Sequence, residues 1–200
     1  MKLMQPFSSI IDSAVPLPMQ NVDTDQIIPA RFLKAIDKAG FGDNLFRDWR
    51  YDRQGAKNEQ FVLNNPKYKG SILVAGTNFG CGSSREHAAW ALYQYGFRCV
   101  VSSFFADIFK NNALNNGIVT VEVSEDYLHR IFLAIENNPN AQFEVDLKNQ
   151  EFTNLTSEER TTFELDPYKK QCLLEGKDDI DYLISLDSEI TSFESSQLIY

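Results

Sequence analysis

The stretch that most constrains the fold is residues 71–96, near the middle of the chain. Its first part, residues 72–75, reads Ile-Leu-Val-Ala, an apolar run with the length of a buried strand. Three glycines then follow in quick succession, at Gly76, Gly80 and Gly82. Because glycine lets the backbone come close to itself or to a ligand, we expect a tight loop at the end of this strand.

A helix is predicted directly after the glycines, from Ser83 to a stop at Gly96. Ser83 and Glu86 have the spacing of a capping box. The free N–H groups and the dipole of a helix start favour an anion, and Ser84 and Arg85 add a hydroxyl and a guanidinium suited to a carboxylate. The spacing therefore predicts an anion site, although a plain strand–turn–helix crossover with serines that only cap the helix fits it as well.

Three segments, in this order, resemble one protein family. Residues 82–88, Gly-Ser-Ser-Arg-Glu-His-Ala, resemble the signature of the swivelling domain of the aconitase superfamily. Residues 21–29 resemble the start of that domain in its free-standing form, the family of 3-isopropylmalate dehydratase small subunits, and residues 103–117 are similar to the segment that follows. The resemblance implies an α/β fold, a three-layer β/β/α swivelling domain with a mixed sheet that carries the loop with Gly80, Cys81 and Gly82.

The order of elements along the chain agrees with one α/β domain over residues 1–200, with a helical extension and acidic tail at residues 156–200. We expect a strand at residues 7–15, ended by Pro16 and Pro18, and a short helix at residues 29–38. Further strands are expected at residues 61–63, 98–102, 118–123, 143–147 and 151–155, with a last strand piece at Phe163. Further helices are expected at residues 105–115, 125–137, 167–175 and 180–185, and the tail from Asp187 is expected to fray.

The composition excludes several classes of function. Basic residues number 19 and acidic residues 28, and an acidic chain with no basic run argues against nucleic-acid binding. No stretch approaches the roughly 20 apolar residues of a membrane helix. The first six residues, Met-Lys-Leu-Met-Gln-Pro, do not predict a signal peptide. We therefore expect no nucleic-acid partner, no membrane partner and a cytoplasmic location.

The three cysteines, Cys81, Cys99 and Cys172, are widely spaced and form no C-x-x-C motif. They predict neither a disulfide framework nor a usual iron–sulfur or zinc ligand set, so no metal and no cofactor are expected in this chain. A thiol nucleophile made of Cys81 and His87 is an alternative that we disfavour. Such a pair needs hydrogen-bond reach, and here one partner is expected in the loop and the other on the helix.

The resemblance also implies roles for single residues. In aconitase-like enzymes the serine that matches Ser83 removes the proton from the substrate, and Ser84 and Arg85 are then expected to hold a substrate carboxylate. Asp25 matches the aspartate of the family's Thr-Asp-x-Ile motif, an active-site position. Without the family, the polar cluster around Asp25 is a turn followed by residues that pack inward.

The loop after Asp25 is where relatives choose their substrate. Phe32 and Leu33 are expected to pack on an isopropyl group, and Arg31 or Lys34 to meet a second carboxylate. Arg47 and Arg50 compete for that second role, because the loop differs in length from that of the aconitases.

The reaction that the resemblance implies is the interconversion of 2-isopropylmalate and 3-isopropylmalate by loss and re-addition of water, in leucine biosynthesis. The departing hydroxyl needs a Lewis acid. The family supplies it as a [4Fe-4S] cluster in a separate large subunit, so we expect a heterodimer or heterotetramer and no activity from this chain alone. The alternatives are a related hydro-lyase for homoaconitate, citraconate or dimethylmalate, a non-catalytic carboxylate-binding module and, more distantly, a nucleotide-binding α/β protein.

Overall fold

The computed structural model describes residues 4–33 and 40–197. Its strands form one mixed sheet in the order β4-β3-β2-β1-β5-β6-β7. The parallel strands are β1 (Ser9–Leu17), β2 (Ile72–Ala75), β3 (Cys99–Ser102) and β4 (Val119–Glu122). The antiparallel strands are β5 (Gln142–Asp146), β6 (Glu151–Asn154) and β7 (Glu159–Thr162). The predicted mixed sheet is confirmed.

The helices fall between and after these strands. They are α1 (Thr24–Ile27), α2 (Arg47–Arg50), α3 (Glu86–Tyr95), α4 (Asp107–Asn115), α5 (Glu125–Asn137), α6 (Pro167–Glu175), α7 (Asp179–Ser185) and α8 (Asp187–Ser196). The predicted helix at residues 125–137 is confirmed at both ends, because its apolar positions repeat at helical spacing and Ser124 caps it by accepting a hydrogen bond from Tyr127 N–H.

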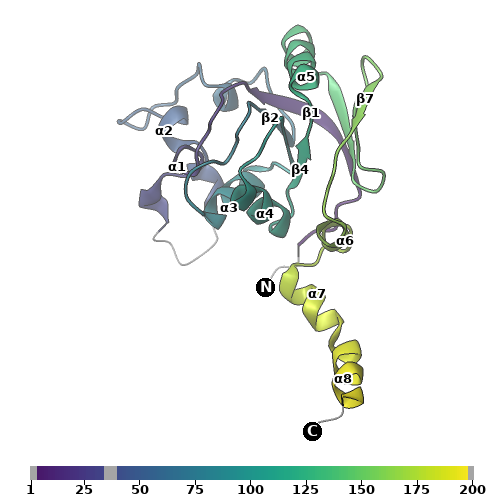
Figure 1. Ribbon diagram of the computed structural model, residues 1–200. Coiled ribbons are helices and arrows are strands. Elements are labelled where there is room, and N and C mark those ends of the chain that lie inside the picture. The colour runs from purple at the N-terminus through teal and green to yellow at the C-terminus, as the bar shows by residue number, and fades with distance from the viewer. Residues whose placement is uncertain (1–3, 34–39, 198–200) are drawn as a thin grey trace.

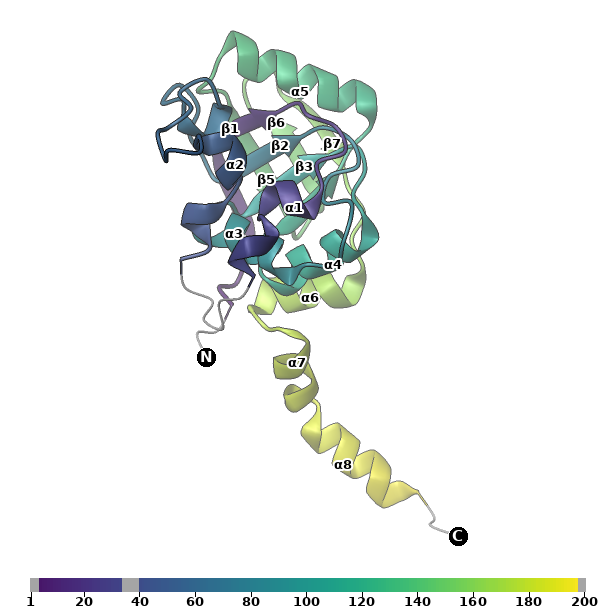
Figure 2. The ribbon, with the colours of Figure 1, turned by 90° about the vertical axis from the view of Figure 1, so that its left-hand side faces the viewer.

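Alternate residues of the parallel strands face two separate hydrophobic cores. Ile72 and Val74 of β2 belong to a core that also holds residues of α5, β5 and β6, whereas Leu73 and Ala75 belong to a core with residues of α3 and α4. All four are fully buried, which explains why β2 reads as a continuous apolar run. In Figure 2, α1, α3 and α4 lie in front of the strands and β5, β6 and β7 lie behind, in agreement with the three layers expected.

Strand β1 continues two residues beyond the end that we predict for it. Residues 9–13 pair with β5, and residues 14–17 pair with β2 alone. Pro16 therefore lies where β1 is paired on one side, opposite Val74, and a missing N–H is tolerated at such an edge. The prediction that Pro16 ends the strand is wrong for this reason.

Three other local predictions are wrong. Residues 61–63 are not a strand, because a 3₁₀ turn at Val62–Asn64 lets the Asn64 side chain donate to the Arg50 carbonyl (2.6 Å). The last strand piece is β7, which ends before Phe163, and that ring is buried in the core. The tail from Asp187 forms helix α8 rather than fraying at its start.

The last helices differ in how they meet the body of the molecule. Helix α6 packs against it: Leu173 is buried in the core, and its carbonyl accepts a hydrogen bond from Phe7 N–H (2.9 Å). Helices α7 and α8 extend away from the body, one after the other, as Figure 1 shows. Within the segment expected as an extension, residues 156–200, β7 and α6 thus contact the body, and α7 and α8 project from it.

We predict that Phe152→Ala lowers the free energy of unfolding by about 3–5 kcal/mol, because Phe152 is fully buried and stacks on Phe143 with ring centroids 5.7 Å apart. Urea denaturation measures this change. Leu155→Ala is the matched control, since Leu155 follows the same strand but is 39% exposed, and its change is expected to stay within about 1 kcal/mol. A loss in Phe152→Ala as small as that of the control would contradict the packing of the β5–β6 hairpin into the core.

Candidate functional site

The carboxyl ends of β1 and β2 lie side by side because the two strands are parallel. The loops that leave them, residues 18–23 and 76–85, remain joined by main-chain hydrogen bonds. These bonds run from Asn21 N–H to the Thr77 carbonyl (2.9 Å) and from Gly80 N–H to the Val22 carbonyl (2.7 Å). Ligands of α/β proteins bind beyond the carboxyl ends of parallel strands, so this pair of loops is the frame of the candidate site.

Two of the three predicted loop glycines are required by close approaches. A Cβ atom on Gly76 would lie 2.4 Å from the Met19 carbonyl oxygen. A Cβ atom on Gly80 would lie 2.1 Å from Cγ of Phe109, and Gly80 also has a φ of +79°, which favours glycine. The sequence thus places glycine where the second loop touches the first loop and helix α4.

The loop after β3 joins the same frame. The Ser102 hydroxyl donates to the Gly76 carbonyl (2.8 Å). Phe79 N–H donates to the Phe104 carbonyl (3.2 Å), and Ala106 N–H donates to the Phe79 carbonyl (3.2 Å). The loops that follow β1, β2 and β3 are therefore in contact in the folded chain.

Four of the predicted site residues lie on this frame. Ser83 and Ser84 are exposed, and the backbone of Ser83 is held by the Thr24 hydroxyl, which donates to its carbonyl (2.9 Å). The Arg85 side chain is 15% exposed and forms an ion pair with Asp25, whose side chain is 54% exposed. The structure thus brings together two accessible hydroxyls, a half-buried guanidinium and a carboxylate.

The predicted helix start at Ser83 is wrong, because α3 begins at Glu86. Thr24 holds the preceding backbone in another conformation: its N–H donates to the Cys81 carbonyl (2.9 Å), and its hydroxyl to the Ser83 carbonyl. The Glu86 carboxylate turns to α4 and accepts a hydrogen bond from the Asn116 side chain (3.1 Å). The capping box is replaced by contacts between loops, and Ser83 lies just before the helix rather than in its first turn.

Cys81 and His87 do not have the surroundings of a catalytic pair. Burial, and then the negative charge of Asp23, raise the pKa of the Cys81 thiol above its ordinary value, which disfavours the thiolate. His87 packs among aromatic rings, 5.3 Å from the centroid of Phe41 and 4.5 Å from that of Trp90. The structure therefore favours a packing role for His87.

The predicted substrate loop contains a 3₁₀ turn at Ala30–Phe32. Lys34 and the rest of the helix predicted at residues 29–38 lie outside the described residues. Phe32 and Leu33 are half-buried. Arg31 pairs with Asp48, and its hydrogen bonds to that carboxyl hold the Asp48 pKa below its usual value.

An open groove of about 1030 Å³ lies beside this turn. Arg31 and Phe32 line it together with Arg47 and Tyr51. The central hydroxyl, Ser83, is not among the described residues that line the groove. Arg31 and Phe32 thus lie far from Ser83 in the sequence and line a groove that Ser83 does not line.

Arg50 is not available for a second carboxylate. It is 8% exposed, and its guanidinium donates to the Leu45 carbonyl (3.2 Å) and to the Asn64 side chain (3.3 Å). Arg47 is half-buried and stacks 3.9 Å over the ring of Tyr51, at the groove. Of the two competing arginines, only Arg47 presents its guanidinium at the groove.

Sequence reasoning missed two residues that position the site, Thr24 and Ser102. Both are buried polar residues whose hydroxyls donate to loop carbonyls. Thr24 lies next to Asp25 in the recognised motif, but its partner Ser83 is 59 positions away. Local spacing carries no signal for such a contact.

The described part of the chain shows neither a metal-binding cluster nor a membrane-spanning helix. Over residues 4–33 and 40–197, no group of three or more His, Cys, Asp or Glu side chains is placed to hold a metal ion. Over the same ranges, no helix combines the length and the apolar character needed to span a bilayer.

Comparison with known proteins identifies the family. The family model described as "Aconitase C-terminal domain" matches residues 4–126. The 3-isopropylmalate dehydratase small subunit of Christiangramia forsetii is 57% identical over 97% of this chain and 95% of its own length. The chain belongs to the family of 3-isopropylmalate dehydratase small subunits. A second member of it, the 3-isopropylmalate dehydratase small subunit of Cytophaga hutchinsonii, is 55% identical over 96% of both chains.

A solved structure supports the same assignment. The crystal structure of 3-isopropylmalate dehydratase from Methanocaldococcus jannaschii is 28% identical and superposes with a TM-score of 0.67, covering 93% of this chain and 99% of that one. The family fold, and not only short motifs, is therefore shared.

We predict that Gly80→Ala destabilises the chain more than Gly55→Ala does. Both glycines have positive φ, +79° and +85°, where an L-residue costs about 1–2 kcal/mol. Only Gly80 has a close neighbour, the Phe109 ring, and overpacking adds about 1–3 kcal/mol. Urea denaturation of the two variants measures the difference, and equal losses would contradict the tight contact between the second loop and α4.

Proposed function

We propose that this chain is the small subunit of a 3-isopropylmalate dehydratase. With a large subunit, it interconverts 2-isopropylmalate and 3-isopropylmalate by removing water and adding it back at the neighbouring carbon. The names of its relatives support the substrate, since they are 57% and 55% identical over nearly the whole chain. The observation that carries the proposal is the exposed Ser83, two positions before Arg85, on a loop that Thr24 and Asp25 contact.

Ser83 is the proposed base of the reaction. Dehydration requires removal of a proton from the carbon next to a carboxylate, and a free hydroxyl is a poor base unless its pKa is lowered. A helix start and a nearby cation are the usual means of lowering it. Ser83 stands shortly before the start of α3 and two positions before Arg85. Its hydroxyl is accessible, and its backbone is fixed by Thr24.

Arg85 and Ser84 are the proposed holders of a substrate carboxylate. A guanidinium makes two parallel hydrogen bonds to a carboxylate. This interaction is stronger when the guanidinium is partly shielded from water. The 15% exposure of the Arg85 side chain meets this condition. Asp25, which pairs with it, is the proposed orienting partner in the free chain.

The 3₁₀ turn after α1 is proposed to recognise the rest of the substrate. Phe32 and Leu33 supply half-buried apolar surface for an isopropyl group. Arg31 is the proposed contact for the second carboxylate, for which it must leave Asp48, and Lys34 remains a candidate for the same role. A hydro-lyase for another alkyl-malate would differ here, so rates on a substrate panel distinguish the related activities.

The proposed partner is a large subunit that carries a [4Fe-4S] cluster, in a heterodimer or heterotetramer in the cytoplasm. Such a cluster, held by the large subunit, would supply the Lewis acid that departure of the hydroxyl needs. This chain supplies the base and the carboxylate contacts, and turnover therefore needs both chains.

We predict that Ser83→Ala lowers kcat of the reconstituted enzyme by about 10²–10⁴-fold, the usual worth of a general base. Anaerobic turnover of 3-isopropylmalate measures it, and size-exclusion chromatography checks that the complex still forms. Ser157→Ala is the control, because Ser157 is exposed in the turn between β6 and β7. A Ser83→Ala enzyme with near-normal kcat would end the assignment of the base.

We predict that Arg85→Lys raises KM by about tenfold or more, because lysine cannot reproduce the two charge-assisted hydrogen bonds of the guanidinium. Arg160→Lys is the control, since Arg160 is exposed on β7. Steady-state kinetics on the reconstituted enzyme separate the effect on KM from that on kcat. An unchanged KM would show that Arg85 serves only the ion pair with Asp25.

A further inference from the structure

The C-terminal arm, defined here as residues 178–197, projects from the body (Figure 1). It leaves large apolar side chains in water. Ile184 and Phe193 are 67% and 63% exposed. The other exposed apolar residues of the arm are Ile180, Leu183 and Ile190. Such surface is unfavourable in water, and a row of it on a helix is typical of a docking face.

These side chains repeat at helical spacing. Ile180, Leu183 and Ile184 stand at i, i+3 and i+4 of α7, and Ile190 and Phe193 stand at i and i+3 of α8. This is the pattern of anchors in helix-in-groove recognition. Each helix of the arm therefore presents an apolar stripe rather than scattered side chains.

The remaining surface of the arm is acidic. Residues 178–197 hold no Lys, Arg or His. Their six acidic residues are Asp178, Asp179, Asp181, Asp187, Glu189 and Glu194. Two arms packed on each other would bring these charges together without a counter-charge, so charge argues against a second copy as the occupant. It favours a groove with an apolar floor and basic edges.

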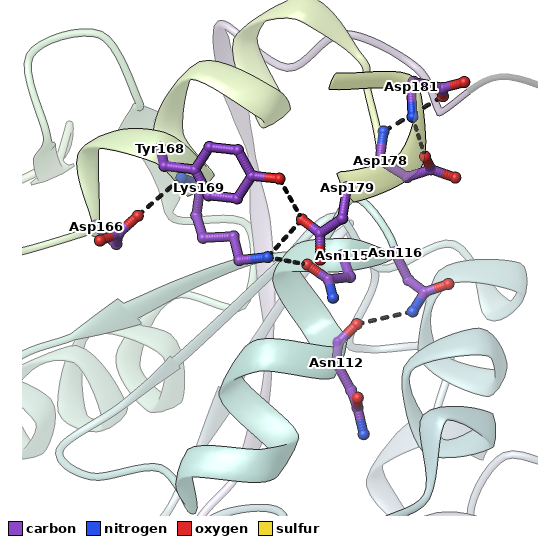
Figure 3. A network of polar contacts seen from close by, with 9 residues as sticks. All are labelled: Asn112, Asn115, Asn116, Asp166, Tyr168, Lys169, Asp178, Asp179 and Asp181. Carbon is purple, nitrogen blue, oxygen red and sulfur yellow. Dashed lines mark hydrogen bonds and ion pairs between the residues drawn. The ribbon is translucent and has the colours of Figure 1, made fainter. Parts of the chain in front are cut away.

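The root of the arm is fixed to the body. Lys169 of α6 donates to Asp179 (2.7 Å) and to Asn115 of α4 (2.6 Å), and the Tyr168 hydroxyl donates to the same Asp179 carboxylate (2.8 Å), as Figure 3 shows. The Tyr168 ring packs edge-on against Tyr182, 4.7 Å between centroids.

The charge of Asp179 is kept in this position. Burial raises its pKa, but the hydrogen bonds from Lys169 and Tyr168 outweigh burial, so the Asp179 pKa is lowered overall. The anchoring ion pair is therefore present at neutral pH. An arm with a fixed root loses less conformational freedom on binding than a free tail.

We propose that the C-terminal arm is a docking element for the large subunit, with the stripe of α7 and α8 laid in an apolar groove with basic edges on that chain. This inference rests on the proposed function, since it needs that partner. The alignment with the Christiangramia forsetii small subunit includes 194 of the 200 residues. At most six residues of this chain therefore lie outside the alignment (200 − 194 = 6), so the relative also has residues that match most of the arm.

The test is the affinity of the full chain for the purified large subunit, measured by biolayer interferometry under anaerobic conditions. A double variant, Ile184→Ser with Phe193→Ser, is expected to weaken binding about tenfold or more, as loss of interface anchors does. Its melting temperature is expected to match wild type, because both side chains are exposed. Leu133→Ser is the control, since Leu133 is 43% exposed on α5, away from the arm (Figure 1), and its affinity is expected to be unchanged.

The outcomes separate the two proposals. Wild-type chain that binds the large subunit and turns over substrate, with a double variant that binds equally well, would overturn the docking arm and leave the proposed function standing. Wild-type chain that neither binds nor turns over would overturn both. Light scattering of the isolated chain checks for a dimer, and a wild-type dimer that the double variant abolishes would assign the stripe to a second copy and so overturn the proposal.

The acidic surface gives an independent readout. Neutralising it with Asp187→Asn, Glu189→Gln and Glu194→Gln is expected to slow association and to flatten the salt dependence of the association rate, because rim charges act mainly on encounter. An association rate and salt dependence equal to those of wild type would contradict basic edges on the groove.

Discussion

Strand β1 hydrogen-bonds to different neighbours along its two halves, and the rest of the structure depends on this division. Its first half pairs antiparallel with β5 and its second half pairs parallel with β2. One strand thereby joins an antiparallel meander to a parallel α/β unit. Because the parallel half comes last, the carboxyl end of β1 lies next to that of β2, and both site loops leave the sheet at one place. This division of β1 is what brings residues 21–25 next to residues 80–85.

The site is held together mainly by main-chain hydrogen bonds between its loops, and the proposed functional side chains project from these loops. Hydrogen bonds between the three loops set the path of the chain, and glycine at positions 76 and 80 permits the approach. The buried hydroxyls of Thr24 and Ser102 then donate hydrogen bonds to loop carbonyls. Ser83 and Ser84 are left exposed, and Arg85 half-buried, on a backbone that these hydrogen bonds hold in place. Such support is the condition for positioning a reacting group within a fraction of an ångström.

Sequence reasoning succeeded where structure is decided locally. The apolar run at residues 72–75 and the periodic residues 125–137 are each sufficient to specify their element. It failed where distant residues decide. The start of α3 depends on Thr24, and the 3₁₀ turn at Val62–Asn64 depends on Arg50. Recognition of the family predicted one site with Ser83, Arg85 and Asp25, but the ion pair of Arg31 with Asp48 and the burial of Arg50 required the folded chain.

The ion pair between Arg85 and Asp25 determines the state of the arginine before substrate binds. The guanidinium already holds a carboxylate, supplied by the protein itself. On the proposed function, an arriving diacid does not meet a bare cation but exchanges one carboxylate for another. Asp25 therefore holds the guanidinium in place before the substrate arrives, and binding of the substrate carboxylate must break this internal ion pair.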